Sequence, residues 1–112
     1  MKDFRSFTVW QKAMTLVQAV YILTRKFPDS EKLGLISQLR RCAVSIPSNI
    51  AEGSKRSTDK DFKQFLIIAS GSAAELETQL LLTENIFHIS DPNLYGVLKE
   101  VQKMLEAFIK KL

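Results

Sequence analysis

Six basic residues of this sequence have side chains of a type and spacing that could bind phosphate groups. Lysine and arginine neutralise phosphate groups and release condensed counterions, so affinity falls as salt rises. Four of the six lie around one predicted turn, in "GSKRSTDKDFK". No exposed aromatic ladder accompanies them, so we expect contacts to the nucleic-acid backbone rather than base stacking. The candidate nucleic-acid-binding residues are Arg40, Arg41, Lys55, Arg56, Lys60 and Lys63.

The overall charge permits nucleic-acid binding without requiring it. The chain has 16 Lys and Arg against 12 Asp and Glu, a formal net charge of +4 at pH 7. Residues 1–57 hold most of the excess positive charge, whereas residues 58–90 are acidic. Attraction between helices of opposite charge, or simple solvation, explains this distribution as well as a binding surface does. Both interpretations stay open at this point.

The side chains that usually carry catalysis or bind metals are too few for an active site. His88 is the single histidine, and with Glu84 it does not make the paired Glu-x-x-His motifs of di-iron bundles. Cys42 lies near an apolar stripe and is predicted to pack as a small apolar residue; a single cysteine fits a reducing cytoplasm. Glu75 and Glu77 are two positions apart and point to different helix faces, which is unsuited to acid–base work. We therefore expect no enzymatic activity, no cofactor and no metal.

The elements that must position these residues are four amphipathic helices. Apolar residues recur at alternating steps of three and four, the period of a helix with one buried face. The predicted helices span residues 7–26, 30–55, 59–88 and 91–112. The predicted boundary signals are Asp29 or Ser30 before the second helix, Gly53 at its end, Ser57 or Thr58 before the third, and Asp91 with Pro92 before the fourth.

Four such helices with short connections fold most simply as an antiparallel up-down-up-down four-helix bundle. A chain of 112 residues suffices for one core, so we predict a single all-α domain over residues 1–112. No strand pattern competes with the helical one. No apolar run reaches the roughly 20 residues that cross a bilayer, and the first residues do not resemble a signal peptide. We therefore expect a cytoplasmic protein without membrane contact.

Pro47 lies inside the second predicted helix, where a proline removes one hydrogen bond and costs about 3 kcal/mol or more. The apolar phase nevertheless continues across it from Ala43 to Ile50. We therefore predict one helix that is kinked at Pro47. The freed carbonyl near Ala43 would bond to water or to a hydroxyl of Ser45 or Ser48. A helix–loop–helix remains the alternative.

Two of the predicted helices carry apolar or small residues away from their core stripes. Val44, Pro47 and Ala51 lie off the stripe of the second helix, and Gly71 and Ala74 lie off that of the third. An ordinary wide core face is one explanation. A surface that contacts another subunit explains both sets, because small residues let a second backbone come close. We therefore predict self-association through these five residues.

Several stretches of the chain resemble one known family. They are "VWQKAM" at 9–14, "FP" at 27–28, "GLISQLRRCAVSIPSNIAEGSKR" at 34–56 and "FKQFLIIASGSAAELETQLLL" at 62–82. These stretches are similar to bacterial four-helix-bundle proteins called 23S rRNA intervening-sequence proteins, and the likeness extends over residues 1–110. The stretch around Pro47 is its most specific part. Cys42 is a minor departure, since alanine is common there.

The resemblance implies an antiparallel four-helix bundle that assembles into a homopentameric, barrel-like ring with a basic surface. A related branch contains the accessory proteins of diversity-generating retroelements, which act with a reverse transcriptase and nucleic acid. The family has no shared catalytic motif. We therefore expect a non-enzymatic oligomer that binds RNA or DNA. The alternative is an oligomeric scaffold or adaptor that binds a protein partner such as a reverse transcriptase, with the basic residues serving only solubility.

Overall fold

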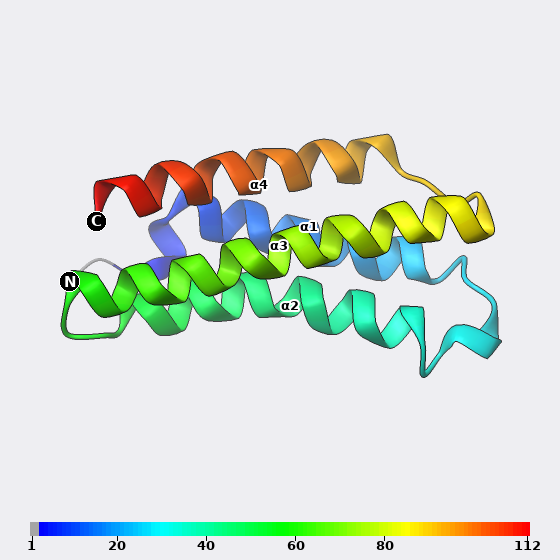
Figure 1. The fold of residues 1–112 in the computed structure, drawn as a ribbon, viewed down its shortest axis with the longest axis horizontal. Helices are drawn as coiled ribbons and strands as arrows, with labels where there is room; N and C mark the ends of the chain where they lie inside the picture. Colours follow the sequence, from blue (N-terminus) through cyan, green and yellow to red (C-terminus); the bar gives the residue numbers. More distant parts are fainter. Residues whose placement is uncertain (1–2) are drawn as a thin grey trace.

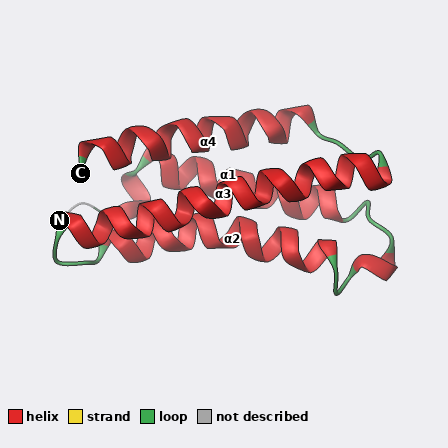
Figure 2. Ribbon diagram, viewed as in Figure 1, coloured by secondary structure: helices red, strands yellow, loops and turns green. Residues whose placement is uncertain are grey.

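The computed structural model describes residues 3–112, and these residues form helices and no strand (Figures 1 and 2). The all-α class predicted from the apolar period is confirmed. Two short 3-10 helices precede the first two long helices. In chain order the elements are η1 (Phe4–Ser6), α1 (Thr8–Thr24), η2 (Asp29–Glu31), α2 (Leu35–Ser54), α3 (Asp59–Phe87) and α4 (Pro92–Lys111).

The four long helices lie side by side, with α1 and α3 running in one direction and α2 and α4 returning (Figure 1). Among the described residues, the backbone of each helix lies close to two neighbours in the cyclic order α1, α2, α3, α4, and diagonal contacts are made only by side chains such as Phe27 and Phe87, whose ring centroids are 5.8 Å apart. The cross-section is therefore a square, in which the edge formed by α1 and α2 lies opposite the edge formed by α3 and α4. The α2–α3 turn lies at the same end of the bundle as the C-terminus.

The core consists of the apolar stripes that the sequence predicts. On α3 the residues Leu66, Ala69, Ala73 and Leu76 are fully buried. Burying a leucine in this way stabilises the fold by about 1.5–3 kcal/mol relative to leaving it exposed. Thr83 continues the same stripe, and its hydroxyl is satisfied because it donates to the Gln79 carbonyl at 2.9 Å.

The helix starts follow the predicted caps in two cases and differ in one. The Thr58 hydroxyl accepts from the backbone of Asp61, and the Asp91 carboxylate caps α4 ahead of Pro92. The start predicted near Ser30 for the second helix is wrong, because the chain first makes η2 and α2 begins only at Leu35. Instead of a cap from residue 29 or 30, the Glu31 carboxylate accepts from the Leu35 N–H at 3.2 Å.

The prediction that Gly53 ends α2 as a C-cap is also wrong. Gly53 is helical and buried, and α2 runs on to Ser54, where Lys55 ends it with an ordinary right-handed backbone. A Cβ atom at position 53 would lie 2.6 Å from the Phe65 Cβ and 2.9 Å from the Phe62 Cδ1. Gly53 is therefore a contact residue, which lets α2 and α3 approach closely just before their turn.

Pro47 lies within α2, which continues from Leu35 to Ser54 without interruption, so the helix–loop–helix alternative is wrong. The Ser45 hydroxyl forms a hydrogen bond with the Ser72 hydroxyl of α3. The Asn49 amide donates to the Ser45 carbonyl at 2.8 Å. The polar residues beside the proline thus tie α2 to α3 and to itself, while the kink stays a prediction.

A carboxylate on α3 holds α4 in place. Glu77 accepts hydrogen bonds from Tyr95, from Lys99 at 2.8 Å and from Gln102 at 2.9 Å, all on α4. These three donors, the Lys99 ammonium first, lower the pKa of Glu77 to about 2. Hydrogen bonds to a charged group are stronger than neutral ones, so this cluster fixes the register between α3 and α4.

Candidate functional site

Four of the six predicted nucleic-acid-binding residues surround the α2–α3 turn at one end of the bundle. Lys55 and Arg56 directly follow α2, and Lys60 and Lys63 lie in the first turns of α3. Lys63 is half-buried and the other three are exposed. The Thr58 cap and the close contact of Gly53 with α3 fix the turn that presents them.

The lysines of this turn are the part of the cluster available to a ligand. Arg56 is 3.6 Å from the Glu52 carboxylate, and its guanidinium lies over the Phe65 ring at 4.7 Å, so its charge is partly compensated. Within residues 3–112, no carboxylate oxygen lies within 4.0 Å of the ammonium groups of Lys55, Lys60 and Lys63. Lys55 and Lys60 are exposed, and the Lys55 ammonium also lies 5.8 Å from the centroid of the Phe4 ring. An exposed ammonium group without a carboxylate partner is what a phosphate contact requires.

The other two predicted residues, Arg40 and Arg41, lie elsewhere on the molecule. They precede the end of α2 by about 14 residues, which is roughly 20 Å at 1.5 Å per residue. Arg40 donates to the Thr24 hydroxyl at 2.9 Å and lies over the Tyr21 ring at 4.4 Å, so it ties α1 to α2. Arg41 is exposed beside Cys42 on the opposite side of α2. The structure therefore does not join them to the turn cluster.

The antiparallel fold adds basic residues to the turn cluster that the sequence reasoning missed. Lys110 and Lys111 end α4 and are exposed at the same end of the bundle as the α2–α3 turn (Figure 1). Lys111 and Arg56 both line an open hollow of about 800 Å³. A signal was present, because a four-helix up-down bundle returns the C-terminus to the end that carries the second turn. We call Lys55, Lys60, Lys63, Lys110 and Lys111 the basic end.

Aromatic rings form the floor of this hollow. Phe7, Phe62 and Phe108 pack together with ring centroids 5.2–6.2 Å apart, and all three line the hollow. They are half-buried and take part in the core. The rings therefore line the hollow beside Arg56 and Lys111 while they pack against the core.

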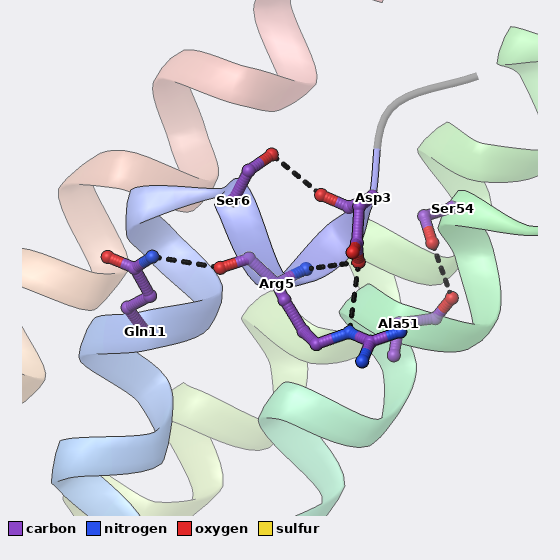
Figure 3. A network of polar contacts seen from close by, with 6 residues as sticks. All are labelled: Asp3, Arg5, Ser6, Gln11, Ala51 and Ser54. Atoms are coloured by element: carbon purple, nitrogen blue, oxygen red, sulfur yellow. Dashed lines mark hydrogen bonds and ion pairs between the residues drawn. The ribbon is translucent and has the colours of Figure 1, made fainter.

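The N-terminal turn closes the bundle on the side of α1 and α2 (Figure 3). Asp3 accepts from the Arg5 backbone N–H at 3.0 Å and from its Nε at 3.1 Å. Gln11 of α1 donates to the Arg5 carbonyl at 2.8 Å. Because the Arg5 charge is matched by Asp3, we do not count it in the basic end.

The residues predicted to meet another subunit lie on two surfaces. Val44, Pro47 and Ala51 line an apolar groove of about 330 Å³ between α1 and α2, together with Trp10 and Met14 of α1. Pro47 is buried within the chain, as the interpretation of a wide core face predicts. Val44 and Met14 are 39% and 37% exposed, so the groove itself is uncovered.

The second surface is the outer side of α3. Gly71 and Ala74 are exposed there, and a Cβ at position 71 would meet nothing within 4 Å. Large apolar residues flank them: Ile67, Ile68, Leu81, Leu82 and Ile86 are 44–57% exposed. We call this surface the α3 ridge. By length and mean hydropathy alone (1.3 over 18 residues), α3 also resembles a membrane span, but core helices of soluble proteins share that property.

The groove and the α3 ridge lie at the same level along the bundle. The bond between Ser45 and Ser72 fixes how α2 passes α3. Val44 and Pro47 flank Ser45, and Gly71 and Ala74 flank Ser72, so both surfaces are at the height of this bond. They face away from each other, because the groove lies on the α1–α2 edge and the ridge on the outer side of α3.

The residues considered for catalysis are distributed as the sequence suggests. Burial and the nearby Glu75 carboxylate raise the pKa of the Cys42 thiol to about 12, and the thiol donates to the Ser72 carbonyl at 3.0 Å. Glu75 faces α2, whereas Glu77 faces α4. His88 ends α3 in the left-handed conformation with φ of 56°. Residues 3–112 contain no cluster of three His, Cys, Asp or Glu side chains that could hold a metal ion.

The family model for the 23S rRNA-intervening sequence protein matches residues 5–107. The chain belongs to this family. The match spans all four helices, and it includes the Pro47 segment, the α2–α3 turn and the α3 ridge. No curated protein matches the chain. For a 23S rRNA-intervening sequence protein, the two surfaces to explain are therefore the basic end and the pair formed by the groove and the ridge.

Proposed function

We propose that this 23S rRNA-intervening sequence protein is a non-enzymatic, cytoplasmic homo-oligomer that binds the phosphate backbone of RNA or DNA through its basic end. The observation that carries the proposal is the group of lysines at one end of the bundle, all exposed except the half-buried Lys63; three of them, Lys55, Lys60 and Lys63, have no carboxylate within 4.0 Å among residues 3–112. Lysines contact phosphates as point charges, so recognition is independent of base sequence.

Self-association follows from the two apolar surfaces. A copy that docks its α3 ridge into the α1–α2 groove of the next copy makes a head-to-tail contact, which closes into a ring when the rotation allows it. Because groove and ridge lie at one height, the bundle axes stay roughly parallel around the ring. The family resemblance implies five copies. Every basic end then lies on the same rim, which concentrates the lysines of all chains.

The binding experiment measures fluorescence anisotropy of mixed-sequence RNA and DNA oligonucleotides across a salt series. We expect binding at low salt and a fall of log K with log salt, with a slope of about −0.7 to −0.9 per phosphate contacted. The variant Lys55→Glu/Lys60→Glu reverses two charges of the basic end and should weaken binding at least tenfold with a shallower salt slope.

The matched control is Arg25→Glu/Lys26→Glu, which reverses two exposed charges at the opposite end of the bundle. It changes the net charge equally, so a general loss of attraction would affect both variants alike. Equal weakening by the two double variants would contradict a localised site. No binding at low salt would refute the nucleic-acid role and favour a scaffold that binds a protein partner.

The oligomer experiment uses light scattering, since one chain has a mass of 12.7 kDa. Gly71→Trp places a large side chain on the α3 ridge where the chain itself leaves space. Gly96→Trp does the same on α4, where a Cβ also meets nothing within 4 Å. We expect the wild type and Gly96→Trp to form the same oligomer and Gly71→Trp to dissociate. A wild type that stays at 12.7 kDa at high concentration would refute the assembly.

A further inference from the structure

The end of the bundle opposite the basic end carries an apolar pocket of about 440 Å³. Its walls include Leu80 and Leu81 of α3, Leu94 of α4 and Ile89 of the α3–α4 connection. Two acidic residues, Glu84 and Asp91, also line it, and the Asp91 carboxylate caps α4. A largely apolar pocket whose lining includes acidic residues suits an apolar side chain that is accompanied by a cation.

A side chain of that description protrudes from the same end of the molecule. Leu33 lies in the connection between η2 and α2 and is 94% exposed, the most exposed large apolar residue of the described chain. Its neighbour Lys32 is exposed and, within residues 3–112, has no ion-pair partner. Covering the side chain of a leucine that is exposed to water lowers the free energy of the system.

We infer, on the basis of the proposed oligomer, that Leu33 of one copy inserts into the pocket between α3 and α4 of the next copy, with Lys32 beside Glu84. Leu33 does not fill the pocket of its own chain, because it is 94% exposed. The connection between α1 and α2 and the connection between α3 and α4 belong to opposite edges of the square (Figure 1). The side chain that occupies the pocket is therefore proposed to be Leu33 of a second copy of the chain.

Leu33 and the pocket lie at similar positions along the bundle axis, as this contact requires. Leu35 is ten residues before Ser45 on α2, and Leu82 is ten residues after Ser72 on α3. Because α2 and α3 are antiparallel and Ser45 contacts Ser72, Leu35 is level with Leu82. Leu33 is then level with the pocket residues that follow Leu81. One head-to-tail movement that places the α3 ridge in the groove therefore also brings Leu33 to the pocket.

The proposed contact also fits the way the apolar surfaces are distributed over the two edges of the bundle. In a head-to-tail ring each copy offers its α1–α2 edge to the α3–α4 edge of its neighbour. The groove and Leu33 belong to the first edge, whereas the ridge and most of the pocket lining belong to the second, with Leu23 of α1 also lining the pocket. The pairing of a lysine with a glutamate at the rim of the pocket sets the register of the ring.

The first test compares Leu33→Asp with Ile22→Asp by light scattering over a dilution series. Both residues are exposed, at 94% and 56%, so neither change removes a core contact, and circular dichroism checks that the helix content is kept. Leu33→Asp should raise the concentration at which the oligomer dissociates at least tenfold. Ile22→Asp should leave it within twofold, because Ile22 lines neither the pocket nor the groove.

The second test traps the contact in a Cys42→Ala background. Chains with Leu33→Cys are mixed with chains with Leu81→Cys and oxidised mildly, and the control mixture pairs Leu33→Cys with Ile22→Cys. A disulfide requires Cα atoms within about 7 Å, so only the proposed contact yields the mixed dimer. A wild-type oligomer with neither the dilution effect nor the mixed disulfide would overturn the Leu33 contact alone. A monomeric wild type would overturn the oligomer and this contact together.

Discussion

Gly53 offers the sharpest test of how the structure positions the basic end. This glycine lies in the last turn of α2 against Phe62 and Phe65 of α3. In Gly53→Ala the new methyl group would lie 2.6 Å from the Phe65 Cβ and 3.3 Å from the Phe62 carbonyl oxygen. Neither atom is the end of a flexible side chain, so relief requires that α2 and α3 move apart.

The size of the effect is a difference between two opposing terms. Overpacking of a closely packed site costs about 1–3 kcal/mol, and two such contacts argue for the upper part of that range. Replacing a helical glycine by alanine gains about 0.8–1 kcal/mol of helix propensity. We expect a net loss of about 1–2 kcal/mol in the free energy of unfolding. For a domain of this size that lowers Tm by about 4–8 °C.

Calorimetry or thermal circular dichroism measures the Tm of Gly53→Ala relative to the wild type, with Gly96→Ala as the matched control. Gly96 is also helical, and a Cβ there meets nothing within 4 Å, so only the propensity term applies. Gly96→Ala should raise Tm by about 3–4 °C. A Gly53→Ala protein that melts at or above the wild type would refute the close approach of α2 and α3. It would also refute the argument that this glycine sets the position of the turn.

Two further predictions concern the ends and the register of α3. Glu77→Gln should lower the free energy of unfolding at pH 7 by about 1–2 kcal/mol, as expected when hydrogen bonds to a charged acceptor are weakened. Because its partners on α4 lower the pKa of Glu77 from 4.5 to about 2, its stabilising effect is complete above about pH 4.5 and is lost as pH falls toward 2. Urea titrations at several pH values should therefore show that the difference in free energy of unfolding between wild type and Glu77→Gln becomes smaller as pH falls from about 4.5 toward 2. A difference that stays constant would contradict the stabilising role of the ionised Glu77. His88→Gly should raise the free energy of unfolding by about 0.5–1 kcal/mol, and with it the urea midpoint, since glycine adopts the φ of 56° without strain. A lower midpoint would show that the His88 side chain contributes a stabilising contact.

The helices and the core could be predicted from the sequence because each core stripe repeats with a helical period over several turns. The stripe of α3 from Leu66 to Thr83 is buried at each position that the period selects. Caps were also predictable where a side chain makes the bond itself, as Thr58 and Asp91 do. These signals are local, so they do not depend on knowing which helix lies beside which.

Features that depend on contact between helices were not predictable in this way. Gly53 has the sequence signature of a helix end, yet its lack of a side chain serves packing against α3. Arg40 looks like a surface cation, yet Thr24 and Tyr21 of α1 hold it. Lys111 is 55 residues after Arg56, and only the return of α4 brings both to one hollow. In each case the deciding partner comes from another helix.

The two proposed properties depend on each other through the geometry of the ring. One chain offers about five lysines at its basic end, and single phosphate contacts by exposed lysines are weak and screened by salt. Head-to-tail copies with parallel axes place all basic ends on one rim, so one nucleic-acid strand can contact several chains at once. Linked sites of this kind raise the overall affinity far above that of one site.

This dependence separates a ring that binds nucleic acid from a monomer that does so. Gly71→Trp changes no charge and lies away from the basic end, on the middle of α3. If the rim is the binding surface, this variant should lose at least tenfold in affinity in the anisotropy assay, and its salt slope should fall to that of one chain. Gly96→Trp should keep both. An undiminished affinity of monomeric Gly71→Trp would mean that each chain binds by itself, and the arrangement of the lysines around a ring would then have no role in binding.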